Sequence, residues 1–301
     1  MTLAGAAGGD AGRALAGRQR PTFLVIGAQK CGTTWLAEML RQHPDVFMPR
    51  QKELHYFNRK SNYAKGLEWY EAHFADARRQ QAIGEATPNY IWVQEACPDR
   101  VPSLGIELER YDYANREAPK LVHAVYPDLR LLVVLRNPVA RAISAFQHHI
   151  RMRRISPRSR ILEEGGKFGI LSMGFYTAQL EAWERYFPRN RFLVLIYEED
   201  VQRAPDAALQ RAFAHVGVDP TFTPEKIGTR FNERSSDAFM LARYYAPRLS
   251  RRLFRALPVL DRIPVPSMNV TTVEREELIR VFAPEVARLE VHLGRSLACW
   301  R

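Results

Sequence analysis

The first ordered segment of the sequence constrains the fold more than any other. Phe23–Ile26 is a short apolar run with β-branched members, which predicts a buried parallel strand. The loop Gly27–Gly32 is bounded by glycines, and Thr33–Gln42 then carries apolar residues at helical spacing. The helix is predicted to end at His43-Pro44, because a proline disfavours the helical conformation of the residue before it. A strand, a glycine-bounded loop and a helix in this order direct backbone amides toward an anion.

The same order of elements recurs along the chain. Two further strands are predicted at Arg130–Leu135 and Phe192–Ile196, and helices are predicted from Val139 to about Ile150 and over Tyr176–Tyr186, Pro205–His215 and Val273–His292. Strands that alternate with helices indicate an α/β fold: a parallel, doubly wound sheet with helices on both faces and a P-loop-like phosphate-binding loop. Ligands of such sheets bind beyond the carboxyl ends of the strands. Trp300, near the C-terminal end of the sequence, is expected to pack against the rest of the domain.

The domain organisation is predicted to be simple. Residues 1–21 are expected to be a disordered tail and 22–301 a single domain, with a helical insertion at about 239–266. Residues 99–120 are polar and are expected to form an excursion on the substrate side. The apolar runs are too short for a transmembrane segment, and the N-terminal residues lack the pattern of a signal peptide. Cys31, Cys97 and Cys299 lack metal-type spacing and indicate reduced thiols, so a cytoplasmic protein without a metal site is expected.

The charge of the chain favours anionic ligands. The formal net charge is +11 at pH 7, and most of the excess is arginine, which suits bidentate binding of phosphate, sulfate and carboxylate. A nucleotide, an acidic glycan, a nucleic acid and a membrane surface are all compatible with this charge. The arginine-rich run at 151–160 is interpreted either as a solvated face or as a rim that steers an anion, and the run at 243–255 has no assigned role.

The glycine-bounded loop has the spacing of a nucleotide-binding P-loop but a different lysine position. Gly27 and Gly32 bracket four residues, and Thr34 occupies the Ser/Thr position, but Thr33 stands where the P-loop lysine belongs. The lysine lies inside the loop instead, at Lys30, from where it reaches the terminal group of a bound anion. A tight turn with a solvated lysine is the alternative. The residues predicted to bind the anion are Gln29, Lys30, Cys31, Gly32, Thr33 and Thr34.

The loop and the residues after it resemble the 5′-phosphosulfate loop of PAPS-dependent sulfotransferases, particularly the heparan-sulfate type and its bacterial relatives. The resemblance implies PAPS as the co-substrate and PAP as the product, without a metal. It also implies that Lys30 contacts the phosphosulfate and stabilises charge on the leaving group. Trp35 matches a position that stacks on the adenine in cytosolic members, and core packing is an equal alternative.

Leu131–Ser144 is similar to the family's 3′-phosphate motif, in which an arginine that closes a strand and a serine in the next helix hold the phosphate. These residues correspond to Arg136 and Ser144. A guanidinium at the carboxyl end of a strand suits a dianionic phosphate. Arg141 is interpreted as a solvated or structural charge. The Lys-Gly-Arg loop of the 3-O-sulfotransferases is missing, and its donor-binding role is assigned to Phe231 and Arg234.

Gln51–Phe57 resembles the family's Lys-Glu-x-His-Phe-Phe segment, whose glutamate removes the proton from the acceptor hydroxyl. The resemblance therefore implies that Glu53 is the general base. His55 is the second candidate for the base, and a hydrogen-bonded core histidine is its alternative. Lys52 is expected to orient the sulfuryl group or to pair with Glu53.

Gly84–Tyr90 looks like the family's Glu-Lys-Ser/Thr-Pro-x-Tyr segment, which lines the active site. Glu85 and Tyr90 are therefore predicted to bind the acceptor, and Glu85 is also an alternative base. Ala86 stands where heparan-sulfate enzymes carry a lysine that contacts substrate and donor. This departure weakens the case for a heparin-like acceptor.

Together these motifs predict a sulfotransferase that moves the sulfuryl group of PAPS to a hydroxyl of a saccharide or of a small-molecule or natural-product acceptor. An anionic or glycosylated acceptor is compatible with the motifs. A P-loop kinase or NTPase is the alternative. It needs a lysine at position 33 and a strand that ends in an aspartate to bind magnesium, and neither is apparent in the sequence. A basic nucleic-acid-binding protein is supported only by charge, and no recognition motif is present, so no nucleic-acid partner is expected. The sequence leaves the identity of the acceptor open.

Overall fold

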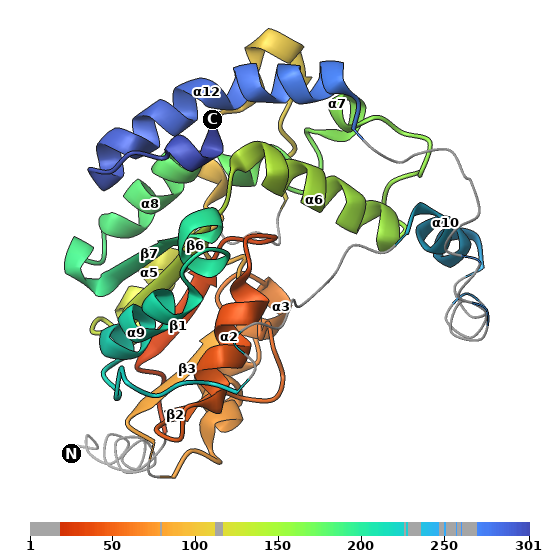
Figure 1. The fold of residues 1–301 in the computed structure, drawn as a ribbon. Coiled ribbons are helices and arrows are strands. Elements are labelled where there is room, and N and C mark those ends of the chain that lie inside the picture. The colour runs from red at the N-terminus through yellow and green to blue at the C-terminus, as the bar shows by residue number, and fades with distance from the viewer. Residues whose placement is uncertain are drawn as a thin grey trace, which may run out of the picture.

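The computed structural model describes residues 19–78, 80–111, 117–225, 227, 236–246, 250, 257, 260 and 270–301. A five-stranded sheet in the order β2-β3-β1-β6-β7 lies at the centre of the molecule, and every pair of neighbouring strands is parallel (Figure 1). Its strands are β1 (Phe23–Gly27), β2 (Val46–Phe47), β3 (Ala82–Ala86), β6 (Arg130–Leu135) and β7 (Phe192–Ile196). The parallel α/β sheet predicted from the sequence is confirmed.

The helices cover both faces of this sheet. Figure 1 shows α2 and α9 in front of it and α5 and α8 behind it. The helices are α2 (Thr33–Gln42), α3 (Lys60–Tyr63), α4 (Gly66–Glu71), α5 (Ala118–Val125), α6 (Pro138–Arg151), α7 (Ile161–Glu164), α8 (Tyr176–Glu184), α9 (Pro205–Val216), α10 (Asp237–Tyr245) and α12 (Thr272–Leu293). The predicted helices are all present, with bounds that differ by at most two residues.

The strand order creates a natural binding edge. After β1 the chain adds β2 and β3 on one side and then β6 and β7 on the other, so the order reverses between β1 and β6. In open α/β sheets, ligands bind beyond the carboxyl ends of the strands at such a switch point. The loops that follow β1 and β6 therefore lie side by side, where an anion can contact both.

Strand β3 is absent from the predicted elements. All five of its residues are buried, and it pairs with β1 through Phe23 opposite Gly84. Its sequence contains a glycine and a glutamate, which are depleted in strands and obscure the buried pattern. The segment that the motif marked as active-site lining therefore begins inside the central sheet.

The polar excursion predicted at 99–120 contains regular structure. It holds a two-stranded antiparallel sheet of β4 (Arg100–Val101) and β5 (Ile106–Glu107), and its last residues begin α5. The predicted tail (1–21) and the helical insertion (239–266) lie largely outside the described residues, so the division into domains stays a prediction. No helix in the described ranges is long and apolar enough to cross a membrane.

Candidate active site

The loop after β1 adopts the backbone geometry of an anion cradle. Lys30 and Gly32 have positive φ values of 69° and 98°, and Gly32 is the N-cap residue of α2. A Cβ at Gly32 would lie 2.7 Å from the ring of Tyr197, so glycine is required there for space as well as for conformation. Within the described ranges no side chain caps α2. Its first backbone amides are therefore available to an anion.

The ammonium of Lys30 lies in a strongly positive environment. Burial, together with the positive charges of Arg151 and Arg136, lowers the pKa of Lys30 to about 8, although the negative charge of Glu53 opposes the shift. Lys30 is therefore mostly charged at neutral pH, but its charge is destabilised by its surroundings. An anion bound at the loop relieves this destabilisation.

Two neighbours of Lys30 in the loop face the protein rather than the solvent. The thiol of Cys31 is fully buried and lies 3.6 Å from the hydroxyl of Tyr176, and burial raises the pKa of Cys31 to about 11. The Nε2 of Gln29 donates to the Oδ1 of Asn89 at 3.5 Å. These side chains hold the loop against the sheet, and the Cys31 thiol stays neutral.

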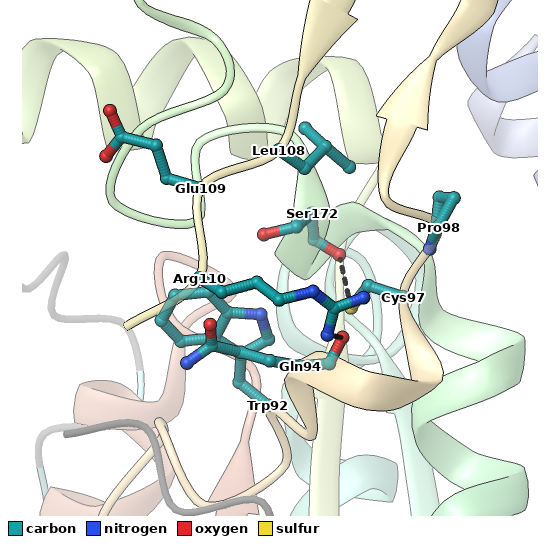
Figure 2. A pocket seen from close by; sticks show the side chains of 8 residues that line it. All are labelled: Trp92, Gln94, Cys97, Pro98, Leu108, Glu109, Arg110 and Ser172. Carbon is teal, nitrogen blue, oxygen red and sulfur yellow. Dashed lines mark hydrogen bonds between the residues drawn. The ribbon is translucent and has the colours of Figure 1, made fainter. Parts of the chain in front are cut away.

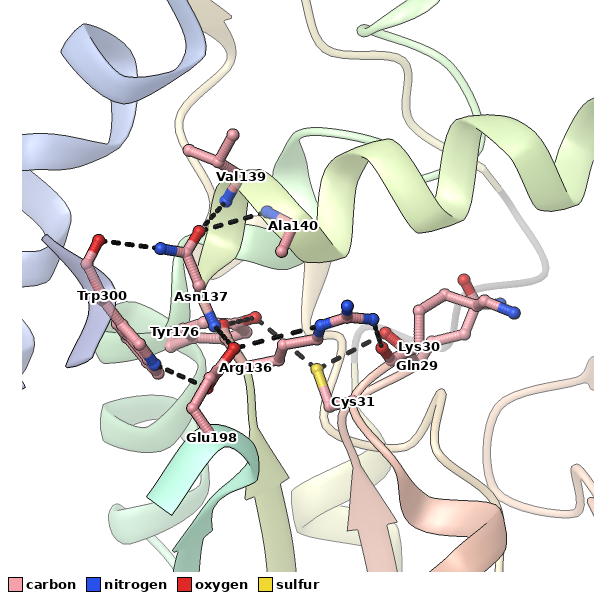
Figure 3. Close-up of polar contacts among 10 residues, drawn as sticks. All are labelled: Gln29, Lys30, Cys31, Arg136, Asn137, Val139, Ala140, Tyr176, Glu198 and Trp300. Atoms are coloured by element: carbon pink, nitrogen blue, oxygen red, sulfur yellow. Dashed lines mark hydrogen bonds and ion pairs between the residues drawn. The ribbon is translucent and has the colours of Figure 1, made fainter. Parts of the chain in front are cut away.

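Arg136 connects the loop after β6 with the loop after β1. Its Nη1 donates to the carbonyl oxygen of Lys30 at 3.4 Å (Figure 3). Its guanidinium lies 5.0 Å from the ring centroid of Tyr197. Its Nε is 4.0 Å from the Oε1 of Glu198 and has no hydrogen-bond partner in the part of the chain that the structure describes. Ser144 lies half-buried on α6, the helix that follows. The structure therefore brings Arg136 and Lys30 together, as the motifs predict.

Arg141 is a structural residue and not a solvated one. Its side chain is fully buried, and its Nη2 donates to the carbonyl oxygens of Gly169 and Ile170. Burial lowers its pKa. Its guanidinium therefore holds the 169–170 turn instead of reaching a ligand.

The predicted acceptor segment contacts the donor loop directly. The Nζ of Lys52 donates to the Oγ1 of Thr34 at 2.6 Å and lies 3.9 Å from the Oε1 of Glu53. The backbone of this segment is strained, because Glu53 and His55 have positive φ values of 61° and 53°. Each such residue costs about 1–3 kcal/mol, and such strain is concentrated at functional sites. The N–H of Glu53 donates to the carbonyl oxygen of Ala86 at 3.1 Å, which fixes the segment on β3.

The two candidate bases differ in accessibility. The side chain of Glu53 is 45% exposed, whereas that of His55 is 9% exposed. A hydrogen bond from His55 lowers the pKa of Glu53, and the positive charge of Lys52 lowers it as well, so Glu53 is ionised at neutral pH. The Nδ1 of His55 lies 3.1 Å from the Oδ1 of Asn58, and its Nε2 lies 3.6 Å from the Oε2 of Glu53. His55 is thus held between two partners, while Glu53 has an accessible, ionised carboxylate.

Glu85 and Tyr90 lie below the surface of the site. Glu85 is 2% exposed, and it accepts hydrogen bonds from the hydroxyls of Thr87 at 2.8 Å and Tyr70 at 3.4 Å. Burial raises the pKa of Glu85 to about 7. The hydroxyl of Tyr90, which is fully buried, accepts from the N–H of Tyr56 at 3.0 Å. Both side chains support the acceptor segment from within, and their contact with an acceptor stays a prediction.

The remaining predicted residues fall into two groups. Trp35 is 6% exposed, packs in the main hydrophobic core, and donates from Nε1 to the carbonyl oxygen of Ile227 at 3.1 Å. Its contact with an adenine stays a prediction, as does the backbone contact of the buried Thr33 with an anion. Phe231 and Arg234 lie outside the described residues.

The basic run at 151–160 is divided between two roles. The charge of Arg151 acts on Lys30, which places this arginine near the donor loop. Arg160 instead pairs with Glu274 at 2.5 Å and joins the start of α7 to α12. The interpretation as a rim therefore fits Arg151, and a structural role fits Arg160.

Two residues near Arg136 were not among the predicted site residues. Tyr197 and Glu198 directly follow β7 and begin a π-helical turn, Tyr197–Val201, in which both side chains face Arg136. π-Helical turns are rare and frequent at functional sites. Their position at the carboxyl end of the predicted strand β7 is the signal that would have found them.

A small pocket lies elsewhere, beside the β4–β5 hairpin (Figure 2). It is lined by Trp92, Gln94, Cys97, Pro98, Leu108, Glu109, Arg110 and Ser172. The thiol of Cys97 is buried there and donates to the carbonyl oxygen of Ser172 at 3.5 Å. No predicted donor or acceptor residue lines this pocket, so it is separate from the candidate active site.

Comparison with known proteins identifies the family. A family model described as a sulfotransferase domain matches residues 20–238. Heparan sulfate glucosamine 3-O-sulfotransferase 6 of Homo sapiens is 35% identical over 185 residues, which cover 59% of this chain and 47% of that protein. Heparan sulfate glucosamine 3-O-sulfotransferase 3B1 of Mus musculus is 30% identical over 214 residues, which cover 68% of this chain and 48% of that protein. The chain spans about half the length of these curated relatives.

A solved structure extends the similarity beyond the matched domain. The crystal structure of a sulfotransferase from Alicyclobacillus acidocaldarius is 25% identical and superimposes with a TM-score of 0.64, covering 94% of this chain and 99% of that chain. The family model alone matches more than half of the chain, and the resemblance of the loop after β1 agrees with it. The chain therefore belongs to the sulfotransferase domain family.

Proposed function

We propose that the protein transfers the sulfuryl group of PAPS to a hydroxyl group of an acceptor and releases PAP. One observation carries this proposal: the guanidinium of Arg136 hydrogen-bonds the backbone of Lys30 at 3.4 Å. This contact joins the segments that resemble the 5′-phosphosulfate loop and the 3′-phosphate motif. The accessible carboxylate of Glu53 acts on the ammonium of the same lysine. Donor-binding cations and a base are thus assembled at one edge of the sheet.

The chemistry of the site fits an anionic donor. Lys30, Arg136 and Arg151 place three positive charges close together. The Nε of Arg136 is buried and unpartnered among the described residues, and no described side chain caps α2. A bidentate guanidinium suits one phosphate, and backbone amides at a helix N-terminus suit another. These groups support binding of PAPS through its 3′-phosphate and its 5′-phosphosulfate.

When bound, PAPS supplies a sulfuryl group whose bond to the 5′-phosphate oxygen breaks as a bond to the acceptor oxygen forms. Glu53 accepts the proton of the acceptor hydroxyl on a carboxylate oxygen. Lys30 stabilises the negative charge that develops on the leaving 5′-phosphate. Lys52 contacts both Thr34 and Glu53, so it holds the base at a fixed position relative to the donor loop.

A saccharide is the acceptor class that the comparisons favour. The curated relatives are named heparan sulfate glucosamine 3-O-sulfotransferases, and this chain shares 28–35% of aligned residues with those relatives. Ala86 replaces the lysine of the heparan-sulfate motif on the buried strand β3, which favours a saccharide other than heparan sulfate. The cytoplasmic location stays a prediction.

Transfer from labelled donor tests the proposed function. The protein is incubated with ³⁵S-labelled PAPS and a panel that contains heparan sulfate oligosaccharides, neutral oligosaccharides, a glycolipid and simple phenols. We expect label in at least one saccharide, with stoichiometric release of PAP and without added magnesium. Failure to label any member, together with failure to bind PAP, would overturn the proposal.

The affinity for PAP is expected to decrease above pH 8. The pKa of Lys30 in the free protein is about 8, and a bound anion favours the protonated form and therefore raises this pKa. Below about pH 7 Lys30 is protonated both in the free protein and in the complex, so its titration should leave the dissociation constant unchanged. It should increase by up to about tenfold per pH unit above pH 8, until the pKa of the complex is reached. Calorimetric titrations from pH 6.5 to 9.5 measure the effect.

The matched control is Lys30→Arg, which stays protonated over this pH range. The variant retains Lys52, whose pKa is also lowered by burial. The difference between the two proteins therefore isolates Lys30. Parallel pH profiles for the wild type and the variant would show that Lys30 does not contact the bound anion.

A further inference from the structure

The carboxylate of Glu198 connects three parts of the molecule. Its Oε1 accepts a hydrogen bond from the N–H of Asn137 at 3.1 Å, and its Oε2 accepts from the Nε1 of Trp300 at 2.8 Å. The same Oε1 lies 4.0 Å from the Nε of Arg136. Figure 3 shows the indole of Trp300 and the Arg136–Asn137 backbone on opposite sides of this carboxylate. Glu198 therefore links the loop after β6 to the short helical turn Ala298–Trp300.

Trp300 also holds Asn137 directly. Its carbonyl oxygen accepts from the Nδ2 of Asn137 at 2.8 Å. The Oδ1 of the same asparagine accepts from the backbone amides of Val139 at 3.0 Å and Ala140 at 3.1 Å, which caps α6. Trp300 is only 8% exposed. The backbone N–H and both side-chain polar atoms of Asn137 are therefore all occupied.

The residue before this asparagine is fixed from the other side. The hydroxyl of Tyr176 donates to the carbonyl oxygen of Arg136 at 2.8 Å. With Asn137 held by Glu198 and Trp300, the backbone on both sides of the Arg136 Cα is anchored. Such anchoring limits the positions that the guanidinium reaches, and preorganised donors bind an anion at lower entropic cost.

The charge of Glu198 is informative because it has the wrong sign for an anion site. A carboxylate 4.0 Å from the Nε of Arg136 repels a phosphate that binds the same guanidinium. Two neutral donors, the Asn137 N–H and the Trp300 indole, take up its oxygens and reduce this repulsion. The arrangement is explained if the carboxylate serves to position the loop.

We propose that Trp300 and Glu198 are positioning residues for the 3′-phosphate of the donor and act through Asn137 and Arg136. The inference rests on the proposed function, and one of its two residues, Trp300, lies outside the family match at 20–238. Neither residue touches the donor. Their contribution should therefore depend on whether the ligand carries a 3′-phosphate.

The variant Trp300→Phe tests the inference with two ligands. Phenylalanine keeps an aromatic ring next to Tyr176, whose ring centroid lies 6.1 Å from that of Trp300. It lacks the N–H that donates to Glu198. We expect the dissociation constant of PAP to increase about 10-fold, because Arg136 is then less fixed before it binds the anion and must be ordered on binding. The dissociation constant of 5′-AMP, which lacks the 3′-phosphate, should stay unchanged. Calorimetry measures both constants, and Arg301→Ala is the control, because Arg301 directly follows Trp300 and pairs with Glu290 of α12.

The variant Glu198→Gln separates positioning from charge and covers the case in which Trp300→Phe fails to fold. Positioning predicts weaker PAP binding, whereas removal of a repulsive charge alone predicts tighter binding. Tighter PAP binding by Glu198→Gln, or an equal effect of Trp300→Phe on PAP and 5′-AMP, would overturn the inference. If the wild type itself does not bind PAP, the proposed function fails as well. If the wild type binds PAP and both variants bind it equally well, only the inference fails.

Discussion

Replacement of Lys30 by alanine is expected to lower the rate of sulfuryl transfer by about 100- to 1,000-fold, the effect of removing one group that stabilises charge in a transition state. Lys30 lies in the loop that precedes α2, and in the proposed mechanism its ammonium stabilises the charge on the leaving 5′-phosphate. The change also removes one positive charge from the donor site, so PAP should bind more weakly. The turnover number is measured by transfer of ³⁵S from labelled PAPS to a saturating acceptor, and the dissociation constant of PAP by calorimetry.

The control for this variant is Lys120→Ala. Lys120 is exposed, pairs with Glu117 at 3.1 Å and belongs to α5, which lies behind the sheet in Figure 1, so its loss should leave both quantities unchanged. An active Lys30→Ala enzyme with normal PAP affinity would mean that the loop is only a tight turn.

Replacement of Glu53 by glutamine is expected to lower the turnover number by about 100- to 10,000-fold, the range for loss of a general base. The carboxylate is accessible and ionised, and glutamine keeps its size but accepts no proton. Because the proposed contact of Glu53 is with the acceptor, and because glutamine removes a negative charge near Lys30, the dissociation constant of PAP should not increase. Turnover and PAP binding are measured on the same preparation.

The same experiment decides between the two candidate bases. His55→Gln should lose less activity than Glu53→Gln, because the imidazole is buried against Asn58 and contacts the carboxylate rather than the surface. Glu38→Gln is the matched control, since Glu38 pairs with Arg41 at the side of α2. A nearly inactive His55→Gln enzyme beside an active Glu53→Gln enzyme would transfer the role of base to His55.

The sheet could be predicted where local pattern and tertiary role agree. Arg130–Leu135 and Phe192–Ile196 are predominantly apolar runs, and they form the buried strand β6 and the partly buried strand β7 with the predicted bounds. The helix at Thr33–Gln42 also has the predicted bounds, because glycine and proline mark its ends. In these segments composition alone determines which elements form.

β3 could not be predicted because its two unusual residues are explained only by distant contacts. A Cβ at Gly84 would lie 2.5 Å from the ring of Phe23, so packing between neighbouring strands requires glycine. The buried carboxylate of Glu85 is tolerated because Thr87 and Tyr70 donate hydrogen bonds to it. Neither reason is visible in the five residues themselves.

The candidate site shows the same division. Lys30 and Arg136 follow predicted strands within recognisable motifs, and the structure brings them to 3.4 Å between the Arg136 Nη1 and the Lys30 carbonyl. Glu198 and Trp300 are 102 residues apart in the sequence, and only the tertiary structure shows that they meet. Arg141 lies in the same motif as Arg136, yet its burial gives it a structural role.

The most direct test of the proposed activity is a calorimetric titration of the wild-type protein with PAP in magnesium-free buffer, compared with ATP and with the variant Arg136→Ala. We expect PAP to bind without magnesium and at least about tenfold more tightly than ATP. Arg136→Ala should lose at least about tenfold in PAP affinity, as for loss of charge-assisted hydrogen bonds. No detectable binding of PAP by the wild type, or ATP binding that is tighter and requires magnesium, would contradict the account.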